Sequence, residues 1–139
     1  IFEEISGLDL FSGTGGISYE FASRACKDII SVETNPLHAN FIKKTSTVLG
    51  ISKQIQSIRY NVFDFIPLCS KQFDIVFADP PYKLDIYSKV VKTLLEKKLL
   101  NDGAIIVLES ENNLDIDETK FKKVSQYKYG LAKIYVLRN

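Results

Sequence analysis

Four consecutive residues, Asp79-Pro80-Pro81-Tyr82, form the segment of this chain best suited to chemistry. They follow Phe73–Ala78, an apolar run that predicts a buried strand. Two prolines fix the backbone and offer no N–H group, so the nearby carbonyl groups remain free to accept hydrogen bonds. Asp79 adds a carboxylate acceptor, and Tyr82 adds an aromatic face on which a base can stack. The segment therefore predicts a site that holds a planar amino group, against the simpler alternative of a proline-rich turn.

A glycine-rich turn near the start of the chain predicts a second binding element. Gly13 and Gly15 follow an apolar strand and precede a helical pattern, and glycines allow a ligand to approach the backbone closely. The dinucleotide fingerprint fits only in part, because Ser18 stands where its third glycine would be. Asp9, just before the glycines, would repel a pyrophosphate but suits an amine, such as the amino-acid end of S-adenosylmethionine (SAM). Phe11 either flanks such a cofactor or belongs to the core.

Glu33 ends a short β-branched run about twenty residues after the first glycine. At this spacing a carboxylate meets the ribose hydroxyls of a bound nucleoside. The alternative is a surface glutamate at the end of a strand.

The elements that must position these residues alternate between strand and helix patterns, which predicts an α/β fold with a mostly parallel sheet. We expect strands at Ser6–Leu10, 29–32, 55–60, Phe73–Ala78 and 104–108, and helices at 16–24, 35–50 and 84–100, with a turn at 101–103. Residues 121–127 and 131–137 alternate like an antiparallel hairpin. Because open parallel sheets bind ligands at the carboxyl ends of their strands, we expect four residues from different strand ends to share one cleft: Asp9, Glu33, Asn61 and Asp79.

The composition of the chain limits the classes of protein to which it can belong. The 139 residues suit one domain with one core, and 45% hydrophobic and 25% charged residues are ordinary for a soluble globular protein. Cys26 and Cys69 lack metal-ligand spacing and are interpreted as reduced thiols of a cytoplasmic protein, while His38, the only histidine, is expected on the solvent side of a helix. We therefore expect no metal site, no membrane span and no secretory signal. A net charge of +1 is weak support for a nucleic-acid partner.

Taken in order, the motifs resemble the RsmD family of class I SAM-dependent methyltransferases. The resemblance covers nearly the whole chain and rests on 9–15, 19–24, Val32-Glu33, Asn61-Val62, 73–82 and 107–111. It implies a Rossmann-like class I methyltransferase sheet, mostly parallel with a C-terminal antiparallel hairpin, in one domain over residues 1–139. It also implies transfer of a methyl group from SAM to the exocyclic N2 of a guanine in 16S ribosomal RNA. Two explanations reconcile this substrate with the low net charge: a missing N-terminal segment supplies the positive charge, or the substrate is an assembled small subunit or its precursor.

The resemblance also assigns residues to roles. The catalytic set would be Asp79, Pro80, Pro81 and Tyr82. The cofactor-binding set would be Asp9, Phe11, Ser12, Gly13, Gly15, Glu33, Thr34, Asn61, Val62 and Asp79. Many SAM enzymes carry an aspartate where Asn61 stands, but the asparagine oxygen can still accept a hydrogen bond from the adenine amino group. The chain begins at Ile1 rather than at methionine, so we expect that the arginine-rich N-terminal segment usual in the family is missing.

Three alternatives stay open at this point. The first is an amino-methyltransferase acting on adenine N6 or cytosine N4 in DNA or another RNA, because the site chemistry is shared. The second is a nicotinamide-dependent oxidoreductase, which would leave Asp9 and Asp79 unexplained. The third is a binding module that kept the fold without catalysis.

Overall fold

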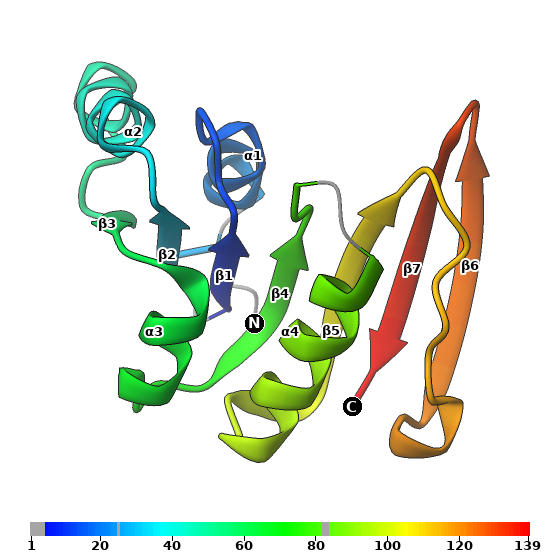
Figure 1. The fold of residues 1–139 in the computed structure, drawn as a ribbon. Helices are drawn as coiled ribbons and strands as arrows, with labels where there is room; N and C mark the ends of the chain where they lie inside the picture. The colour runs from blue at the N-terminus through cyan, green and yellow to red at the C-terminus, as the bar shows by residue number, and fades with distance from the viewer. Residues whose placement is uncertain (1–4, 25, 82–83) are drawn as a thin grey trace.

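The computed structural model describes residues 5–24, 26–81 and 84–139, which fold into one seven-stranded sheet between helices (Figure 1). The strands are β1 (Ser6–Leu10), β2 (Asp28–Glu33), β3 (Ile55–Arg59), β4 (Phe73–Ala78), β5 (Leu100–Ser110), β6 (Lys123–Tyr129) and β7 (Ala132–Arg138). The helices are α1 (Gly16–Ser23), α2 (Pro36–Val48), α3 (Val62–Leu68) and α4 (Leu84–Glu96), with a 3₁₀ turn at Glu118–Lys120.

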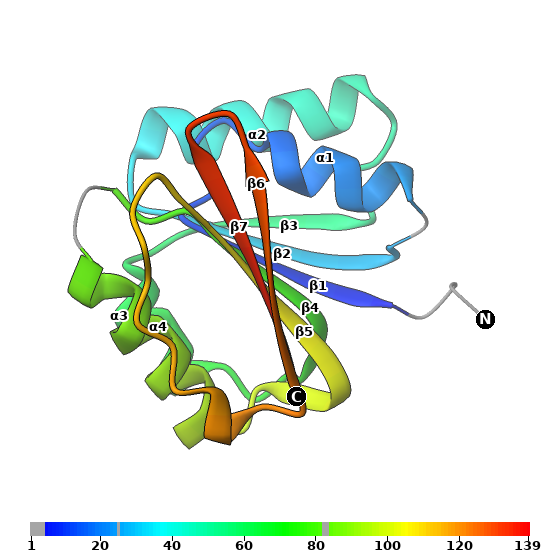
Figure 2. The ribbon, with the colours of Figure 1, turned by 90° about the vertical axis from the view of Figure 1, so that its right-hand side faces the viewer.

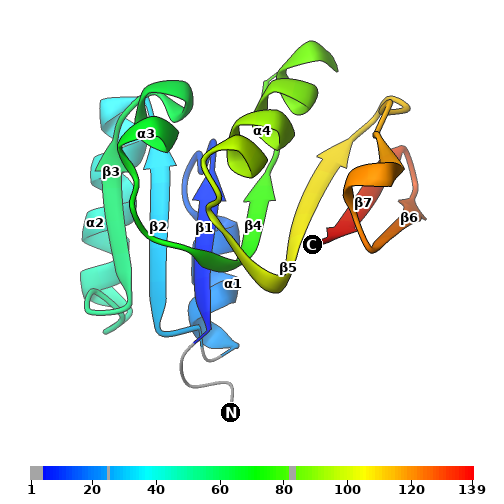
Figure 3. The same ribbon diagram turned by 90° about the horizontal axis from the view of Figure 1, so that it is seen from below.

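The strand order β3-β2-β1-β4-β5-β7-β6 confirms the predicted fold class. The first five strands pair in parallel, and β7 pairs antiparallel with both β5 and β6. The chain runs outward from β1 to β3 and then returns to β4 beside β1, so the direction of winding reverses between β1 and β4 (Figure 3). A reversal of this kind leaves a crevice at the carboxyl ends of the strands, where doubly wound sheets bind ligands.

Two helices cover each face of the sheet (Figure 2), over cores of unequal size. Figure 2 shows α1 and α2 on one side of the sheet and α3 and α4 on the other. Successive strand side chains point to opposite faces. Even-numbered residues such as Leu8 and Leu10 join the larger core under α3 and α4, whereas Ile29 and Ile55 pack with Ile42 of α2 in a smaller core. The odd-numbered face of β1 and β2 therefore lies under α1 and α2, and this decides where Asp9 points.

Most predicted boundaries lie within two residues of those observed, and the strands Ser6–Leu10 and Phe73–Ala78 are confirmed in full. The helix predicted for 84–100 is too long, because α4 ends at Glu96 and Lys98 adopts a positive φ of 56°. The turn predicted at 101–103 is wrong. These residues belong to β5, where the pairing with β4 shifts register between Phe73 and Ile75.

Helix α3 is absent from the sequence prediction. Asn61 caps it through a hydrogen bond from the Phe63 amide nitrogen to Asn61 Oδ1 at 2.8 Å. The helix is only seven residues long, and it contains Pro67 together with β-branched and aromatic residues, which do not favour a helix. Its apolar side chains, Val62, Phe65 and Ile66, are buried in the larger core, so tertiary packing stabilises it.

No helix within the described ranges is long and apolar enough to cross a membrane. Cys26 is buried and Cys69 is half-buried, and both are free thiols.

Candidate active site

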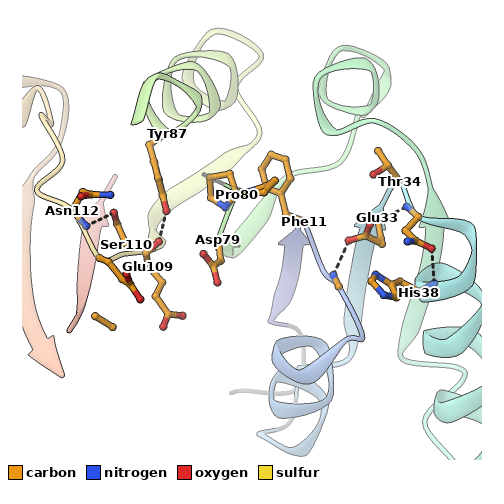
Figure 4. Close-up of a pocket in the computed structure, with 15 residues that line it drawn as sticks. Phe11, Glu33, Thr34, His38, Asp79, Pro80, Tyr87, Glu109, Ser110 and Asn112 are labelled. Atoms are coloured by element: carbon orange, nitrogen blue, oxygen red, sulfur yellow. Dashed lines mark hydrogen bonds between the residues drawn. The ribbon is translucent and has the colours of Figure 1, made fainter. Parts of the chain in front are cut away.

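A cleft of about 730 Å³ opens where the carboxyl ends of the central strands meet (Figure 4). Its walls come from the turn after β1, the connection from β2 to α2, the segment after β4, helix α4 and the end of β5. Among the residues predicted from sequence, those that line it are Phe11, Gly13, Glu33, Thr34, Asp79, Pro80 and Pro81. Of the four residues expected to share one cleft, Glu33 and Asp79 line it, whereas Asp9 and Asn61 do not.

The turn after β1 is held by its own hydrogen bonds. Ser12 Oγ donates to the carbonyl oxygen of Asp9 at 2.6 Å, and the Gly15 amide donates to the carbonyl oxygen of Ser12 at 3.0 Å. Gly15 has a φ of +93°, and a Cβ atom there would lie 2.8 Å from side chains of Tyr19 and Ile42. Only glycine fits this position, so Ser12 and Gly15 shape the turn without lining the cleft.

Glu33 ties this turn to the next one. Its Oε1 accepts a hydrogen bond from the Gly13 amide at 2.7 Å, and its Oε2 accepts one from the Asn35 amide at 2.9 Å. A carboxylate oxygen has two lone pairs, so each oxygen retains capacity for another donor. Glu33 is thus a fixed carboxylate on the wall of the cleft that can accept hydrogen bonds from a ligand's hydroxyl groups.

Asp9 lies beneath the turn and not on the wall of the cleft. Its side chain is 1% exposed and accepts a hydrogen bond from Ser18 Oγ at 2.7 Å. Ser18 in turn shares a short hydrogen bond with Ser31. Burial raises the pKa of the Asp9 carboxyl to about 7, although the hydrogen bond from Ser18 opposes this rise. Asp9 therefore supports the turn from below, and its predicted contact with a cofactor stays a prediction.

Asp79 extends from the end of β4 into the cleft beside Pro80 (Figure 4), and Pro81 also lines the cleft. Asp79 is exposed to the cleft, whereas Pro80 is buried behind it. Desolvation raises the pKa of the Asp79 carboxyl, and the nearby negative charge of Glu109 raises it further. The Asp79 carboxylate is therefore not directed into the core, and its catalytic role stays a prediction. Tyr82, the fourth predicted catalytic residue, lies outside the described residues.

Asn61 and Val62 do not reach the cleft. Asn61 lines a neighbouring hollow of about 380 Å³ together with Arg59, Tyr60 and Asp64, and Thr34 borders both hollows. Asn61 Oδ1 already caps α3, while Val62 is buried in the core at 2% exposure. Their predicted roles in cofactor binding stay predictions.

Several residues that line the cleft were missed by sequence reasoning. They are Asn35, His38, Tyr87, Glu109, Ser110, Glu111, Asn112 and Ala132. His38, expected on the solvent side, is half-buried on the cleft wall. Tyr87 is buried, and its hydroxyl group donates to the backbone carbonyl of Glu109 at 2.5 Å (Figure 4). The available signal for Glu109 was its place after an apolar run, in the same way that Glu33 and Asp79 follow the apolar runs of β2 and β4.

Within the described ranges, no group of three or more metal-ligating side chains comes together. The cleft is rich in hydrogen-bond acceptors, among them the carboxylates of Glu33 near the glycine turn, Asp79 beside two prolines and Glu109 near the end of β5.

Comparison with known proteins identifies the family. The family model described as "Conserved hypothetical protein 95" matches residues 2–138. The chain belongs to the RsmD family. A relative named "Ribosomal RNA small subunit methyltransferase D", from Buchnera aphidicola subsp. Baizongia pistaciae, is 32% identical over 108 residues, which cover 78% of this chain and 55% of the relative. "Uncharacterized methylase RP545" from Rickettsia prowazekii is 30% identical and is covered to 75% of its length, against 94% of this chain.

This RsmD-family chain thus spans about half the length of the first of these relatives. Among solved structures, a conserved hypothetical protein from Streptococcus pyogenes is 26% identical with a TM-score of 0.88, covering 96% of this chain and 85% of that one. An RNA methyltransferase from Salinibacter ruber, solved in complex with S-adenosyl-L-homocysteine, has a TM-score of 0.76 at 16% identity, covering 96% of this chain and 80% of that one. The fold is therefore that of class I methyltransferases.

Proposed function

We propose that this protein transfers a methyl group from SAM to the exocyclic N2 of a guanine in small-subunit ribosomal RNA. The observation that carries the proposal is the position of Asp79 and Pro80, which face the same cleft as the glycine turn and Glu33. Relatives named as ribosomal RNA small subunit methyltransferases support the substrate, and the solved methyltransferase with bound S-adenosyl-L-homocysteine supports the cofactor.

The donor and acceptor groups of the cleft suit SAM. Glu33 offers unfilled lone pairs to the ribose hydroxyls, and its bond to Gly13 keeps the carboxylate in place before the cofactor arrives. Phe11, which has a φ of 58° at the glycine turn, presents its ring on the cleft wall. Asn61 would accept a hydrogen bond from the adenine amino group in the neighbouring hollow, which shares Thr34 with the cleft.

SAM carries its methyl group on a sulfonium, an electrophile that a correctly aimed nitrogen lone pair can attack. The amino nitrogen of guanine is a weak nucleophile, because its lone pair is delocalised into the ring. The Asp79 carboxylate and the Pro80 carbonyl would each accept one of the two amino hydrogens, which aims the lone pair and stabilises the positive charge that develops on nitrogen. As the new bond between nitrogen and the methyl carbon forms, the bond from that carbon to sulfur would break, and S-adenosyl-L-homocysteine would leave with the electron pair. The methylated nitrogen is acidic, so no base has to act before attack, and its surplus proton would pass to the Asp79 carboxylate or to solvent. Tyr82 would stack on the base after it has left its helix.

A ribosomal RNA substrate also agrees with the surface next to the cleft. Tyr127 and Tyr129 are 55% and 76% exposed on β6, and Tyr129 pairs with Ala132, which lines the cleft. The hairpin of β6 and β7 turns at the same end of the sheet as the cleft (Figure 1). Exposed aromatic rings are sequence-tolerant surfaces for stacking unpaired bases. The net charge of +1 provides little general attraction to phosphate, so an assembled subunit that shares the docking is the partner we propose.

The experiment is methyl transfer from radiolabelled SAM to naked small-subunit RNA, to assembled small subunits and to DNA, followed by nucleoside analysis. We expect N2-methylguanine in an RNA-containing sample. Asp79→Ala should abolish transfer while SAM affinity, measured by calorimetry, stays within a few fold of the wild type. Label in DNA alone, or in N6 of adenine or N4 of cytosine, would replace the proposed substrate with the rival amino-methyltransferase. Unchanged turnover by Asp79→Ala would remove Asp79 from the mechanism.

A further inference from the structure

Two carboxylates stand side by side on the strand ends at the cleft. Ala78 and Leu108 pair in register in the parallel strands β4 and β5, and Asp79 and Glu109 are the residues that follow them. Neighbouring strands are about 4.8 Å apart, and equivalent positions of a parallel pair point to the same face. Figure 4 shows both side chains extending into the cleft from these two strand ends. A base whose amino group is held by Asp79 can therefore place the atom next to that amino group within reach of Glu109.

The position of Glu109 is fixed by its backbone. Its carbonyl oxygen accepts the bond from the buried Tyr87 hydroxyl, and its residue pairs with Ile134 in the antiparallel ladder of β5 and β7. The side chain of Glu109 is not needed for either contact. The carboxylate is thus presented to the cleft by a rigid strand, as a site that recognises a substrate requires.

The edge of guanine next to its amino group carries a hydrogen. N1–H and the N2 amino group are both attached to C2, so guanine presents two neighbouring donors on its Watson–Crick edge. Adenine beside its N6 amino group, and cytosine beside its N4 amino group, instead carry a ring nitrogen with a lone pair. A carboxylate accepts from the first arrangement and is repelled by the second, so a single acidic residue can both bind guanine and reject the other bases.

We infer that Glu109 accepts a hydrogen bond from N1–H of the target guanine and selects guanine over bases that carry a lone pair at this position. The inference rests on the proposed methylation of guanine N2, and it adds a second contact residue for the substrate. In this arrangement Asp79 and Pro80 bind the reacting amino group, and the Glu109 carboxylate accepts a hydrogen bond from the neighbouring N1–H.

The test replaces the target guanine with 2-aminopurine, which keeps the 2-amino group but has a lone pair at N1. The methylated nucleotide is first located in small-subunit RNA, or in subunits assembled from it, by nuclease digestion and mass spectrometry. Ligation then introduces 2-aminopurine at that one position. We measure kcat/KM for both substrates with the wild type, Glu109→Gln and Glu118→Gln. Glu118 is exposed on the 3₁₀ turn and is not among the residues that line the cleft, so its variant is a matched control for the loss of one carboxylate.

The wild type and Glu118→Gln should prefer guanine by about tenfold or more, which is the usual discrimination of a direct base contact. Glu109→Gln should reduce that preference by about tenfold, because an amide can donate to the N1 lone pair as well as accept from N1–H. The missing O6 of 2-aminopurine affects every variant alike, so the comparison of preferences isolates Glu109. An unchanged preference in Glu109→Gln would overturn the inference while leaving the proposed function intact. If the wild type methylates guanine N2 in neither RNA nor assembled subunits, the proposed function fails, and the inference fails with it.

Discussion

Replacing Asp9 with asparagine should make the protein more stable at alkaline pH and change the pH dependence of its unfolding. Asp9 is buried beneath the glycine turn with a pKa of about 7, raised from the ordinary 3.8 by desolvation. Between these two values the native protein keeps a proton that the unfolded chain has lost. Stability contributed at this position therefore falls as the pH rises from about 4 to about 7, and levels off above.

The magnitude follows from the two pKa values. A tenfold difference in proton affinity is worth about 1.4 kcal/mol, so the full cost of ionising Asp9 in the native state is about 4 kcal/mol. About 2–3 kcal/mol of this cost develops between pH 5 and pH 8. The asparagine side chain of the variant Asp9→Asn is neutral at every pH, so it avoids the cost while its amide oxygen can still accept from Ser18.

The assay is urea unfolding followed by circular dichroism at intervals from pH 5 to pH 8, for the wild type and Asp9→Asn. The free energy of unfolding of the variant minus that of the wild type should rise by about 2–3 kcal/mol over this range. Asp102→Asn is the control. The hydrogen bond and charge of Lys122 lower the pKa of exposed Asp102, so that its contribution is lost only in more acidic solution. A difference for Asp9→Asn that stays constant from pH 5 to pH 8 would refute the reasoning, since it would mean that Asp9 ionises alike in both states.

Three further outcomes are expected. Glu33→Ala should weaken SAM binding by about 1–3 kcal/mol in calorimetry, because a charge-assisted hydrogen bond and the anchor of Gly13 are both lost; wild-type affinity would contradict the ribose role. Gly15→Ala should lower the free energy of unfolding, measured by urea titration, by about 1–3 kcal/mol, because the new methyl group would lie 2.8 Å from neighbouring side chains at a φ of +93°. An unchanged urea midpoint of unfolding would mean that the turn relaxes without cost. In Glu109→Gln, the fall of kcat/KM in acidic solution should occur at lower pH than in the wild type, because the charge of Glu109 raises the pKa of Asp79. If this part of the pH profile does not move, protonation of Asp79 is not what causes the fall.

Much of the fold and half of the site were determined by local sequence patterns. The buried strands Ser6–Leu10 and Phe73–Ala78 are short apolar runs, and turn-forming residues follow each of them: glycines after the first and prolines after the second. The backbone preferences of glycine and proline act over one or two residues, so the two turns that carry Gly13 and Pro80 could be located from sequence. Because both turns follow parallel strands, their meeting at one edge of the sheet also followed from the pattern.

The sequence could not decide what each carboxylate would face. Asp9 and Glu33 both stand near strand ends before a turn, yet one is buried under α1 and the other lines the cleft. Both residues occupy the same face of the sheet, since Asp9 pairs with Ser31 and Glu33 is two positions farther along β2. The difference is how far each lies along its strand: Asp9 is level with Ser31 and contacts Ser18 of α1, whereas Glu33 is the last residue of β2 and reaches the cleft. Similarly, residues 101–103 carry a strong turn signal, yet β5 continues through them. They lie in the register shift between the pairs Phe73–Leu100 and Ile75–Ile105, and Asn139 forms hydrogen bonds with Asn101 and Gly103 there.

Tertiary structure alone placed Glu109 beside Asp79. The two residues are thirty positions apart, and no local pattern links them. They become neighbours because β4 and β5 pair with Ala78 opposite Leu108, and a shift of one residue in that register would turn the Glu109 side chain to the opposite face. Register is set by the packing of the whole sheet against its helices, since only one alignment buries Val76 and Ile106 together in the core. Local residue preferences thus determined where the chain turns and which groups it exposes there, whereas the burial of apolar side chains over the whole sheet decided which of those groups meet.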